Sequence, residues 1–417
     1  VRSRAASFLA DFGEADLLIR SLRNAPPLAR QGICHALARK SDPAALQTLL
    51  DRLADSDPGV QGEAARALGR RGDRSATEQL IAAFRKEADP FALEAVALLS
   101  PDRVGELIVE AAQDRNYQVR QVAAETGPAE TVTRLVADRD WRVRAAAIEA
   151  SLAHRERSVI GALIAQFPLE KGRLRWDLLQ ALHDLTGKDI GLNPASWKAW
   201  WDVQSETFVP PARGGTGGPQ PGATRASFFK IPILSTRIVF VLDLSGSMRD
   251  PAPGGTRTKL DVAKEGMFET IRSLPSEARF GISGLGCDEN GAWTSREKKT
   301  WGTRLALHPA QPPLKADAER FVRGLEARGW TNLYDGLEYA FADPDVDTIY
   351  LYSDGGASKG TFVAAGEILA HLARLNRFRK IVIHTVEVPG EKNPEDNRRL
   401  LEAIARTSGG TSVLHER

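Results

Sequence analysis

Two different hydrophobic patterns divide the chain. From Ala25 to about Trp201, apolar residues recur at helical spacing in an Ala-, Leu- and Arg-rich sequence. After Ile231, short apolar runs rich in β-branched residues alternate with amphipathic segments. The first pattern predicts helices that each bury one face. The second predicts a mostly parallel sheet with helices on both faces. We therefore expect a multi-domain protein, all-α at its N-terminus and α/β, doubly wound and Rossmann-like, at its C-terminus.

The helical half repeats itself weakly. The clearest copies are "DSDPGVQGEAARALG", "DRNYQVRQVAAETG" and "DRDWRVRAAAIEAS". In each copy an Asp precedes a Val by five positions and an Ala follows that Val by four, giving Asp55, Val60 and Ala64; Asp114, Val119 and Ala123; and Asp138, Val143 and Ala147. We expect the Asp to cap the following helix and the Val and Ala to face a neighbouring helix.

Weaker copies centred on Leu28, Ala92 and Leu174 extend the series, with successive centres 24 to 32 residues apart. That spacing fits one pair of short helices per repeat. The repeats resemble HEAT-like repeats of the short bacterial type over Leu17 to Gln204, and the resemblance implies a solenoid whose surface binds a partner. The alternative is an irregular helical bundle. We place this domain at residues 1–204.

The last helical segment, "NPASWKAWWDVQ", puts Trp197, Trp200 and Trp201 on one face. A terminal repeat has no neighbour to cover its apolar surface, which favours an end cap over a carbohydrate-binding platform. The following sequence, "VPPARGGTGGPQPGATRASFFK", is rich in Pro and Gly and predicts a linker over residues 205–230.

The C-terminal half, residues 231–417, alternates predicted strands with predicted helices. The strands are "RIVFVLD", "RFGISGLG", "TRLALHP", "TIYLYSD", "KIVIHTVEV" and "TSVLHE". The helices are "LDVAKEGMFETIRSL", "ADAERFVRGLEAR", "TNLYDGLEYAFA", "AAGEILAHLARLN" and "PEDNRRLLEAIARTS". The third strand follows the second closely, which predicts an antiparallel edge strand.

Polar side chains with oxygen atoms follow two of these strands. Asp243, Ser245 and Ser247 end the first strand in "DLSGS", and Asp354 ends the fourth in "YSDGG". Ligand sites in open α/β sheets lie beyond the carboxyl ends of the strands. Carboxylates and hydroxyls are hard ligands that suit Mg²⁺, Mn²⁺ or Ca²⁺. Thr331 stands at a loop-to-helix junction. The alternatives are an N-cap for Thr331 and an Asp-Gly turn for Asp354.

Together, Asp243, Ser245, Ser247, Thr331 and Asp354 resemble the Asp-x-Ser-x-Ser, Thr and Asp of the von Willebrand factor type A domain with its metal-ion-dependent adhesion site. The resemblance covers Arg237 to Glu416. It implies that these five residues bind Mg²⁺, or Mn²⁺ or Ca²⁺ in its place. It also implies that an Asp or Glu of a protein ligand completes the coordination shell.

Charge and composition narrow the function further. Lys and Arg total 56 against 54 Asp and Glu, and the balance holds in each half, which argues against a dedicated nucleic-acid binder. The sequence has no apolar run long enough for a membrane span. Cys34 and Cys287 lack metal-ligand spacing and predict two free thiols. The compartment stays open, with an extracytoplasmic location favoured over the cytoplasm.

No His residue lies in the site motifs, and neither serine stands in a G-x-S-x-G sequence. We therefore expect a non-enzymatic interaction or scaffold protein. One alternative is a subunit that works beside an ATPase of the AAA+ type, as the family resemblance allows. Another, from a different class, is a divalent-metal-dependent hydrolase.

Overall fold

The structure is a computed structural model that describes residues 14–211, 226–253, 255–286, 305–389 and 394–415. The chain forms two compact units. The first comprises Val1–Pro168 and Leu178–Gly218, and the second comprises Leu169–Asp177 and Pro219–Arg417. Each unit is described by itself below.

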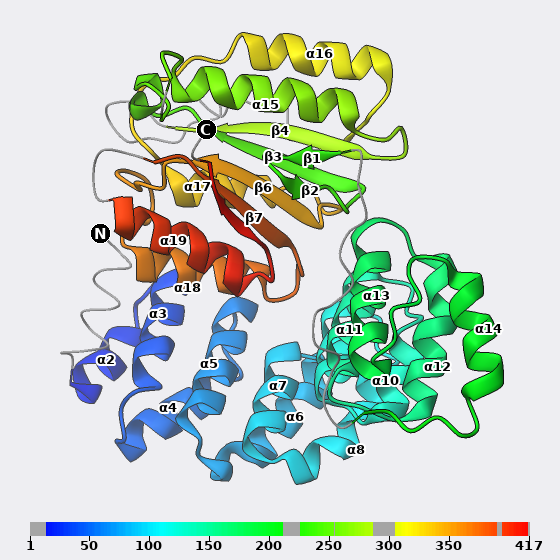
Figure 1. Cartoon of the computed structure of the whole chain (residues 1–417). Helices are drawn as coiled ribbons and strands as arrows, with labels where there is room; N and C mark the ends of the chain where they lie inside the picture. Colours follow the sequence, from blue (N-terminus) through cyan, green and yellow to red (C-terminus); the bar gives the residue numbers. More distant parts are fainter. Residues whose placement is uncertain (1–13, 212–225, 254, 287–304, 390–393, 416–417) are drawn as a thin grey trace. The chain divides into compact units, whose positions relative to one another are not determined.

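The first unit is helical throughout its described part (Figure 1). Its α-helices are α2 (Ala15–Leu22), α3 (Pro27–Leu37), α4 (Pro43–Arg52), α5 (Pro58–Arg71), α6 (Thr77–Glu87), α7 (Pro90–Leu99), α8 (Pro101–Ala111), α9 (Tyr117–Thr126), α10 (Ala129–Leu135), α11 (Trp141–Ser151), α12 (Arg157–Gln166) and α14 (Pro194–Gln204). Helix α13 (Gly172–Thr186) begins in the residues assigned to the second unit. No described helix in the chain is long and apolar enough to cross a membrane.

The predicted repeat centres all lie in the first turn of a helix, in α3, α5, α7, α9, α11 and α13. Helix α5 packs against α3 and α7, and α9 packs against α7 and α11, so alternate helices stack along the array. The repeated Val and Ala side chains are fully buried between them, as at Val119 and Ala123 of α9. The structure thus confirms the expected arrangement of one helix pair per repeat. The pairs stack because neither helix of a pair can bury its apolar face alone.

The capping residues differ from the prediction by two positions. The N-caps of α5, α9 and α11 are Asp57, Asn116 and Asp140, whose side chains accept a backbone N–H of their own helix. Asp138 instead accepts the backbone N–H of Asp140 at 2.7 Å, and Asp55 and Asp114 do the same two residues before their caps. The repeated Asp therefore orders the turn that positions the cap.

Two of these turn carboxylates also anchor an arginine. Arg120 donates through Nε and Nη2 to both oxygens of Asp138 at 2.7 and 2.8 Å. Arg30 makes the same two-bond contact with Asp55. The Arg120 side chain is only 5 % exposed, and its third nitrogen donates to the carbonyls of Asp114 and Arg115. Each arginine therefore links successive turns of the array through a planar, bidentate contact.

Helix α14 ends the helical array as an aromatic cap. Trp197 is completely buried, and its Nε1 donates to the carbonyl of Gly191 at 2.8 Å. Helix α14 packs on α12, where the Trp201 indole lies over Gly161. Phe208 packs edge-on against Trp200 at 5.1 Å between ring centroids. Because these rings cover one another, the end-cap prediction fits the structure better than an open carbohydrate platform.

The second unit contains a six-stranded sheet in the order β5-β4-β3-β6-β7-β8. The strands are β3 (Arg237–Asp243), β4 (Arg279–Leu285), β5 (His308–Pro309), β6 (Thr348–Ser353), β7 (Val382–Glu387) and β8 (Ser412–Leu414). All neighbours are parallel except β5, which pairs antiparallel with β4 at one edge, as the sequence predicts. Strand β5 covers only the last two residues of the predicted third strand. Residues 305–307 are described and lie outside a strand, and residues 303 and 304 lie outside the described residues.

Helices cover both faces of this sheet (Figure 1). Successive residues of β3 point to opposite faces of the sheet, and each face is apolar. Phe240 faces α15 (Lys259–Ser273) and α16 (Pro312–Arg323) on one side. Val241 faces the other core, which contains residues of α17 (Leu333–Ala340), α18 (Ala365–Asn376) and α19 (Pro394–Thr407). The predicted doubly wound α/β class is confirmed.

The two ends of the predicted linker belong to the folded units. Strands β1 (Ser227–Phe228) and β2 (Ile231–Pro232) form a short antiparallel hairpin. Phe228 is fully buried, with its ring 5.3 Å from that of Phe240. At the other end, Phe208 packs on the aromatic cap described above. Placing residues 205–230 together in a linker therefore misplaces these aromatic ends, while residues 212–225 lie outside the described residues.

Of the two cysteines predicted to be free thiols, the structure describes only Cys34. Cys34 is a free, buried thiol in α3, and burial raises its pKa to about 12. A thiol with so high a pKa is a poor nucleophile and behaves as a small apolar side chain. Cys287 lies outside the described residues.

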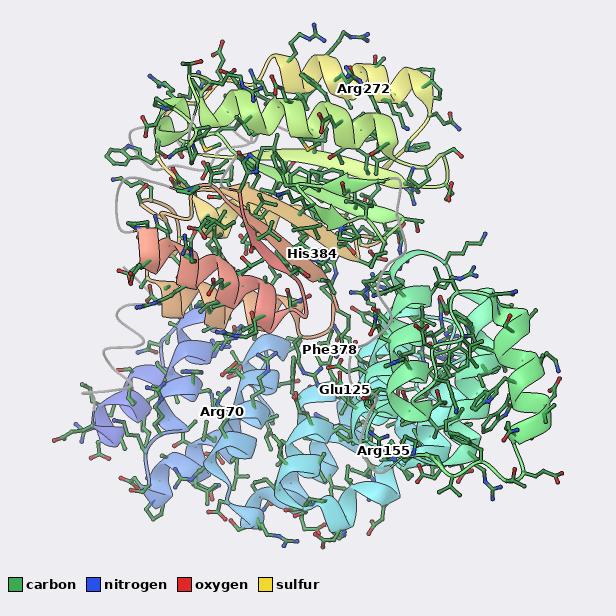
Figure 2. The ribbon with its side chains drawn as sticks, in the orientation of Figure 1. Arg70, Glu125, Arg155, Arg272, Phe378 and His384 are labelled. Atoms are coloured by element: carbon green, nitrogen blue, oxygen red, sulfur yellow. The ribbon has the colours of Figure 1, made fainter. Side chains whose placement is uncertain are left out.

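We predict that His384 makes the second unit sensitive to acid. His384 lies on strand β7, where Figure 2 labels it. Its ring stacks on Tyr350 in the sheet, and Nδ1 accepts the Thr411 N–H at 3.0 Å. Burial, aided by the charge of Arg173, lowers the pKa of His384 to about 4. Because the unfolded chain binds this proton more readily, His384 contributes stability above about pH 6.5 that is lost as the pH falls toward 4.

Between pH 7 and pH 5 this single group should reduce the free energy of unfolding by about 2 kcal/mol. Thermal or urea unfolding of the full chain at both pH values measures the loss. His384→Asn retains a hydrogen-bond acceptor and does not titrate, so the variant should lose less stability than the wild type. Equal losses in the two proteins would contradict the prediction.

Candidate metal centre

The candidate site lies where the chain reverses its direction of travel across the sheet. Strand β4 lies on one side of β3, and β6, the next parallel strand along the chain, lies on the other. The carboxyl ends of β3 and β6 are therefore neighbours at a topological switch point, where open α/β sheets bind ligands. Asp243 is the last residue of β3, and Asp354 follows β6 directly.

The loop after β3 turns sharply so that its serines lie together. The Ser245 N–H donates to Asp243 Oδ1 at 2.8 Å, and the Ser245 and Ser247 hydroxyl oxygens are 3.1 Å apart. Gly246 begins a 3₁₀ turn, Gly246–Arg249, and a Cβ at this position would lie 3.2 Å from the carbonyl oxygen of Gly329. Glycine therefore permits the close approach of the loop that leads to Thr331.

Asp243 is completely buried and accepts hydrogen bonds at both carboxylate oxygens. The Ser353 hydroxyl donates to Oδ2 at 2.6 Å and accepts the Gly355 N–H at 3.0 Å. Burial, followed by the nearby charge of Asp354, raises the pKa of Asp243 to about 7. Two carboxylates that share a buried site repel each other, so a cation beside them would stabilise both in the ionised form.

Asp354 already faces a cation from this chain. Its Oδ2 lies 3.2 Å from the Lys259 ammonium, and the two side chains are 7 % and 2 % exposed. The Asp-Gly turn proposed as the alternative exists, because Gly355 adopts a positive φ of 81°. The Gly355 N–H, however, donates to Ser353 and not to the Asp354 carboxylate. The turn therefore orients the Asp354 side chain, but the Asp354 carboxylate does not accept the Gly355 N–H.

Backbone contacts hold the segment before Thr331 against the serine loop. The Gly246 N–H donates to the Gly329 carbonyl at 3.0 Å, and the Arg328 N–H donates to the Leu244 carbonyl at 2.7 Å. These bonds place Thr331, which is 5 % exposed, two residues beyond a segment bonded to the serine loop. Its N–H donates to the Ser358 hydroxyl, in the loop that follows Asp354. The N-cap of α17 is Asn332, so the alternative role for Thr331 is wrong.

The donor chemistry of these residues fits a hard divalent cation. Around a bound cation, Asp243 and Asp354 would supply charge, and the three hydroxyls of Ser245, Ser247 and Thr331 would supply neutral oxygen ligands. No group of three or more His, Cys, Asp or Glu residues suited to a metal occurs in the described part of the chain. A site built from two carboxylates and hydroxyls suits Mg²⁺ or Mn²⁺ better than Zn²⁺, which prefers His and Cys.

Two residues of the site were not predicted from the sequence. Ser353 orients Asp243, although only its position before Asp354 in "YSDGG" could have drawn attention to it. Lys259 carries a clearer signal, because it is the first residue of α15, directly after the N-cap Thr258. The positive end of the helix dipole disfavours a cation there, which is the local feature that sets this lysine apart.

The described residues define a protein with a helical array followed by a doubly wound α/β domain consistent with a von Willebrand factor type A fold. Residues 14–100 match the family model for HEAT repeats. Inter-alpha-trypsin inhibitor heavy chain H3 of Homo sapiens is 25% identical over 142 residues, which cover 31% of this chain and 14% of the relative. The same protein of Pongo abelii matches to the same extent. The chain thus spans about 14% of the length of the curated relatives it matches.

Two solved structures are similar to parts of the chain. A von Willebrand factor type A protein from Catenulispora acidiphila has 22% identity and a TM-score of 0.32, covering 44% of this chain and 40% of that one. The complex of CpcE and CpcF of phycocyanin lyase from a Nostoc species has 20% identity and a TM-score of 0.30, covering 43% of this chain and 80% of that one.

Proposed function

We propose that this protein is a non-enzymatic interaction scaffold whose second unit binds a divalent cation and, through it, an acidic group of a protein partner. Asp243, Ser245, Ser247, Thr331 and Asp354 would hold the cation, with Mg²⁺, Mn²⁺ or Ca²⁺ as candidates. The observation that carries the proposal is the position of Asp243 and Asp354 at adjacent strand ends of the switch point, beside two serine hydroxyls.

The chemistry of the proposed site supports a bridging role. Two carboxylates and neutral hydroxyls leave a divalent cation able to accept a further oxygen ligand. A bound cation would supply a positive charge at that position. A carboxylate from a partner fits this charge and coordination better than a neutral group does.

The rim of the site offers an aromatic contact for a partner. Trp330, next to Thr331, is 44 % exposed. The Lys359 ammonium lies 5.4 Å from the centroid of its ring. Partly exposed Trp side chains are frequent binding hot spots, so Trp330 would help select the partner while the cation binds the acidic group. The HEAT repeats would provide a second binding surface.

A pull-down from the native organism tests this function. The immobilised full chain should capture partners in Mg²⁺ buffer, lose them in EDTA, and recover them when Mg²⁺ or Mn²⁺ is restored. An Asp243→Asn chain should capture none of these partners, whereas Asp250→Asn, which changes a carboxylate in the same loop, should capture them all. Identical partners under every condition would show that binding does not depend on the cation.

The pull-down and a separate activity assay distinguish the two alternative functions. An AAA+ ATPase among the proteins that EDTA releases would identify the scaffold as a subunit acting beside that ATPase. Turnover of phosphoester or peptide substrates by the metal-loaded chain, abolished by Asp243→Asn, would instead identify a metal-dependent hydrolase.

A further inference from the structure

A buried lysine lies inside the candidate metal centre. Lys259 Nζ is 3.2 Å from Asp354 Oδ2, and the lysine side chain is 2 % exposed. An ammonium removed from water is stable only beside a compensating charge, so the contact with Asp354 is required for this burial. The pair joins residues 95 positions apart in the sequence.

The backbone fixes this lysine in place. The Lys259 N–H donates to the Asp250 carbonyl at 3.0 Å, and Thr258 pairs with Pro251 in an isolated antiparallel β-bridge. Thr258 and Asp261 form a capping box that determines where α15 begins. Leu260, the next residue, is buried in the core between the helix and the sheet. Lys259 therefore cannot move its backbone away from the site without disrupting the start of α15.

We propose that Lys259 is an internal cation of the metal centre, which neutralises Asp354 when no divalent cation is bound and weakens the binding of that cation. The inference rests on the proposed metal-binding function. Asp243 and Asp354 carry two negative charges when ionised, and Lys259 reduces the net charge of the site to about −1. An incoming divalent cation must either displace the ammonium from Asp354 or bind in its repulsive field.

The same charge affects the partner that the loaded site prefers. With a divalent cation bound and Lys259 retained, the two carboxylates are overcompensated and the centre carries about one net positive charge. Without the lysine the loaded centre would be neutral. Lys259 thus makes the loaded site select an anionic group, while a low cation affinity keeps the site largely empty until that group is present.

Titration calorimetry of the full chain with Mn²⁺ tests the inference. Lys259→Met and Lys259→Gln should each bind Mn²⁺ about tenfold more tightly than the wild type, because both remove the competing charge. Lys264→Met is the matched control, since its ammonium lies on the same helix and donates to the Arg323 carbonyl instead. That variant should bind Mn²⁺ as the wild type does.

Thermal unfolding provides a second readout. Without metal, both Lys259 variants should melt below the wild type, because Asp354 loses its ammonium partner and the repulsion between Asp354 and Asp243 is left uncompensated. Added Mn²⁺ should narrow this difference by taking over the role of the lysine. If both variants remain unfolded even with Mn²⁺, the cation cannot replace the lysine and the inference is wrong.

The outcomes separate this inference from the proposed function. Wild-type Mn²⁺ binding with equal or weaker binding by the Lys259 variants would overturn the inference and leave the metal site intact. Binding by the Lys259 variants alone would support the inference and overturn a metal bridge in the wild type. Failure of every protein to bind Mn²⁺ would overturn both.

Discussion

Replacing Asp243 with Asn is expected to reduce the affinity of the second unit for Mn²⁺ or Mg²⁺ by about a hundredfold or more. The substitution removes one of the two carboxylate charges while keeping the shape of the side chain. Asn can still accept the Ser245 N–H through its oxygen, and its amide can donate to the Ser353 hydroxyl. The fold should therefore survive the change, and the loss of binding can be attributed to the missing charge.

Titration calorimetry with Mn²⁺ measures this effect, and Asp250→Asn is the control. Asp250 lies in the same loop and its backbone carbonyl accepts the Lys259 N–H, which the substitution leaves in place. The control should bind Mn²⁺ with wild-type affinity. An Asp243→Asn chain that binds Mn²⁺ as tightly as the control would remove Asp243 from the set of metal ligands.

The second large effect is expected in the helical unit, where Arg120→Met should reduce the free energy of unfolding by about 3–5 kcal/mol. Met retains most of the apolar volume, so packing is largely preserved. The change leaves the Asp138 carboxylate, which is 7 % exposed, without its bidentate partner. It also leaves the carbonyls of Asp114 and Arg115 without the Arg120 donor. An uncompensated buried charge is among the most destabilising defects in a protein.

Urea unfolding of the full chain, followed by circular dichroism at helical wavelengths, measures this loss. Arg103→Met is the control, because Arg103 pairs with Glu78 and Glu106 on an exposed surface and should contribute little. Arg120→Met combined with Asp138→Asn should recover part of the stability, since it removes the stranded charge. If Arg120→Met and Arg103→Met were equally mild, the buried pair would not stabilise the array.

Within the candidate site, sequence and structure contributed different information. The order of Asp243, Ser245, Ser247, Thr331 and Asp354 along a βα pattern indicated a ligand site, because strand ends and loops can be recognised locally. The structure places the two serines beside Asp243 and pairs Asp354 with Lys259. That pairing changes the expected charge of the site, and no local pattern contains it.

The sequence by itself determined the elements. The apolar run "RIVFVLD" coincides with β3, and the repeat centres fall in successive helices, because the alternation of buried and exposed positions is set over a few residues. The sequence predicted Asp55 as the cap of α5, and the structure shows Asp57. This error is two positions within one turn. Local chemistry identifies a turn more reliably than it identifies which of two carboxylates bonds to the helix.

Only the tertiary structure decided which polar groups meet. Ser353 and Asp243 are 110 residues apart, and Lys259 and Asp354 are 95 apart. The sequence assigned Phe228 to the end of a linker, whereas in the structure the β1–β2 hairpin packs it against Phe240. Such contacts depend on the order of strands in the sheet and on the helices packed over it. Many sequences share the same local periodicity, but the energy of a buried charge depends on its neighbours in space, which the fold alone brings together.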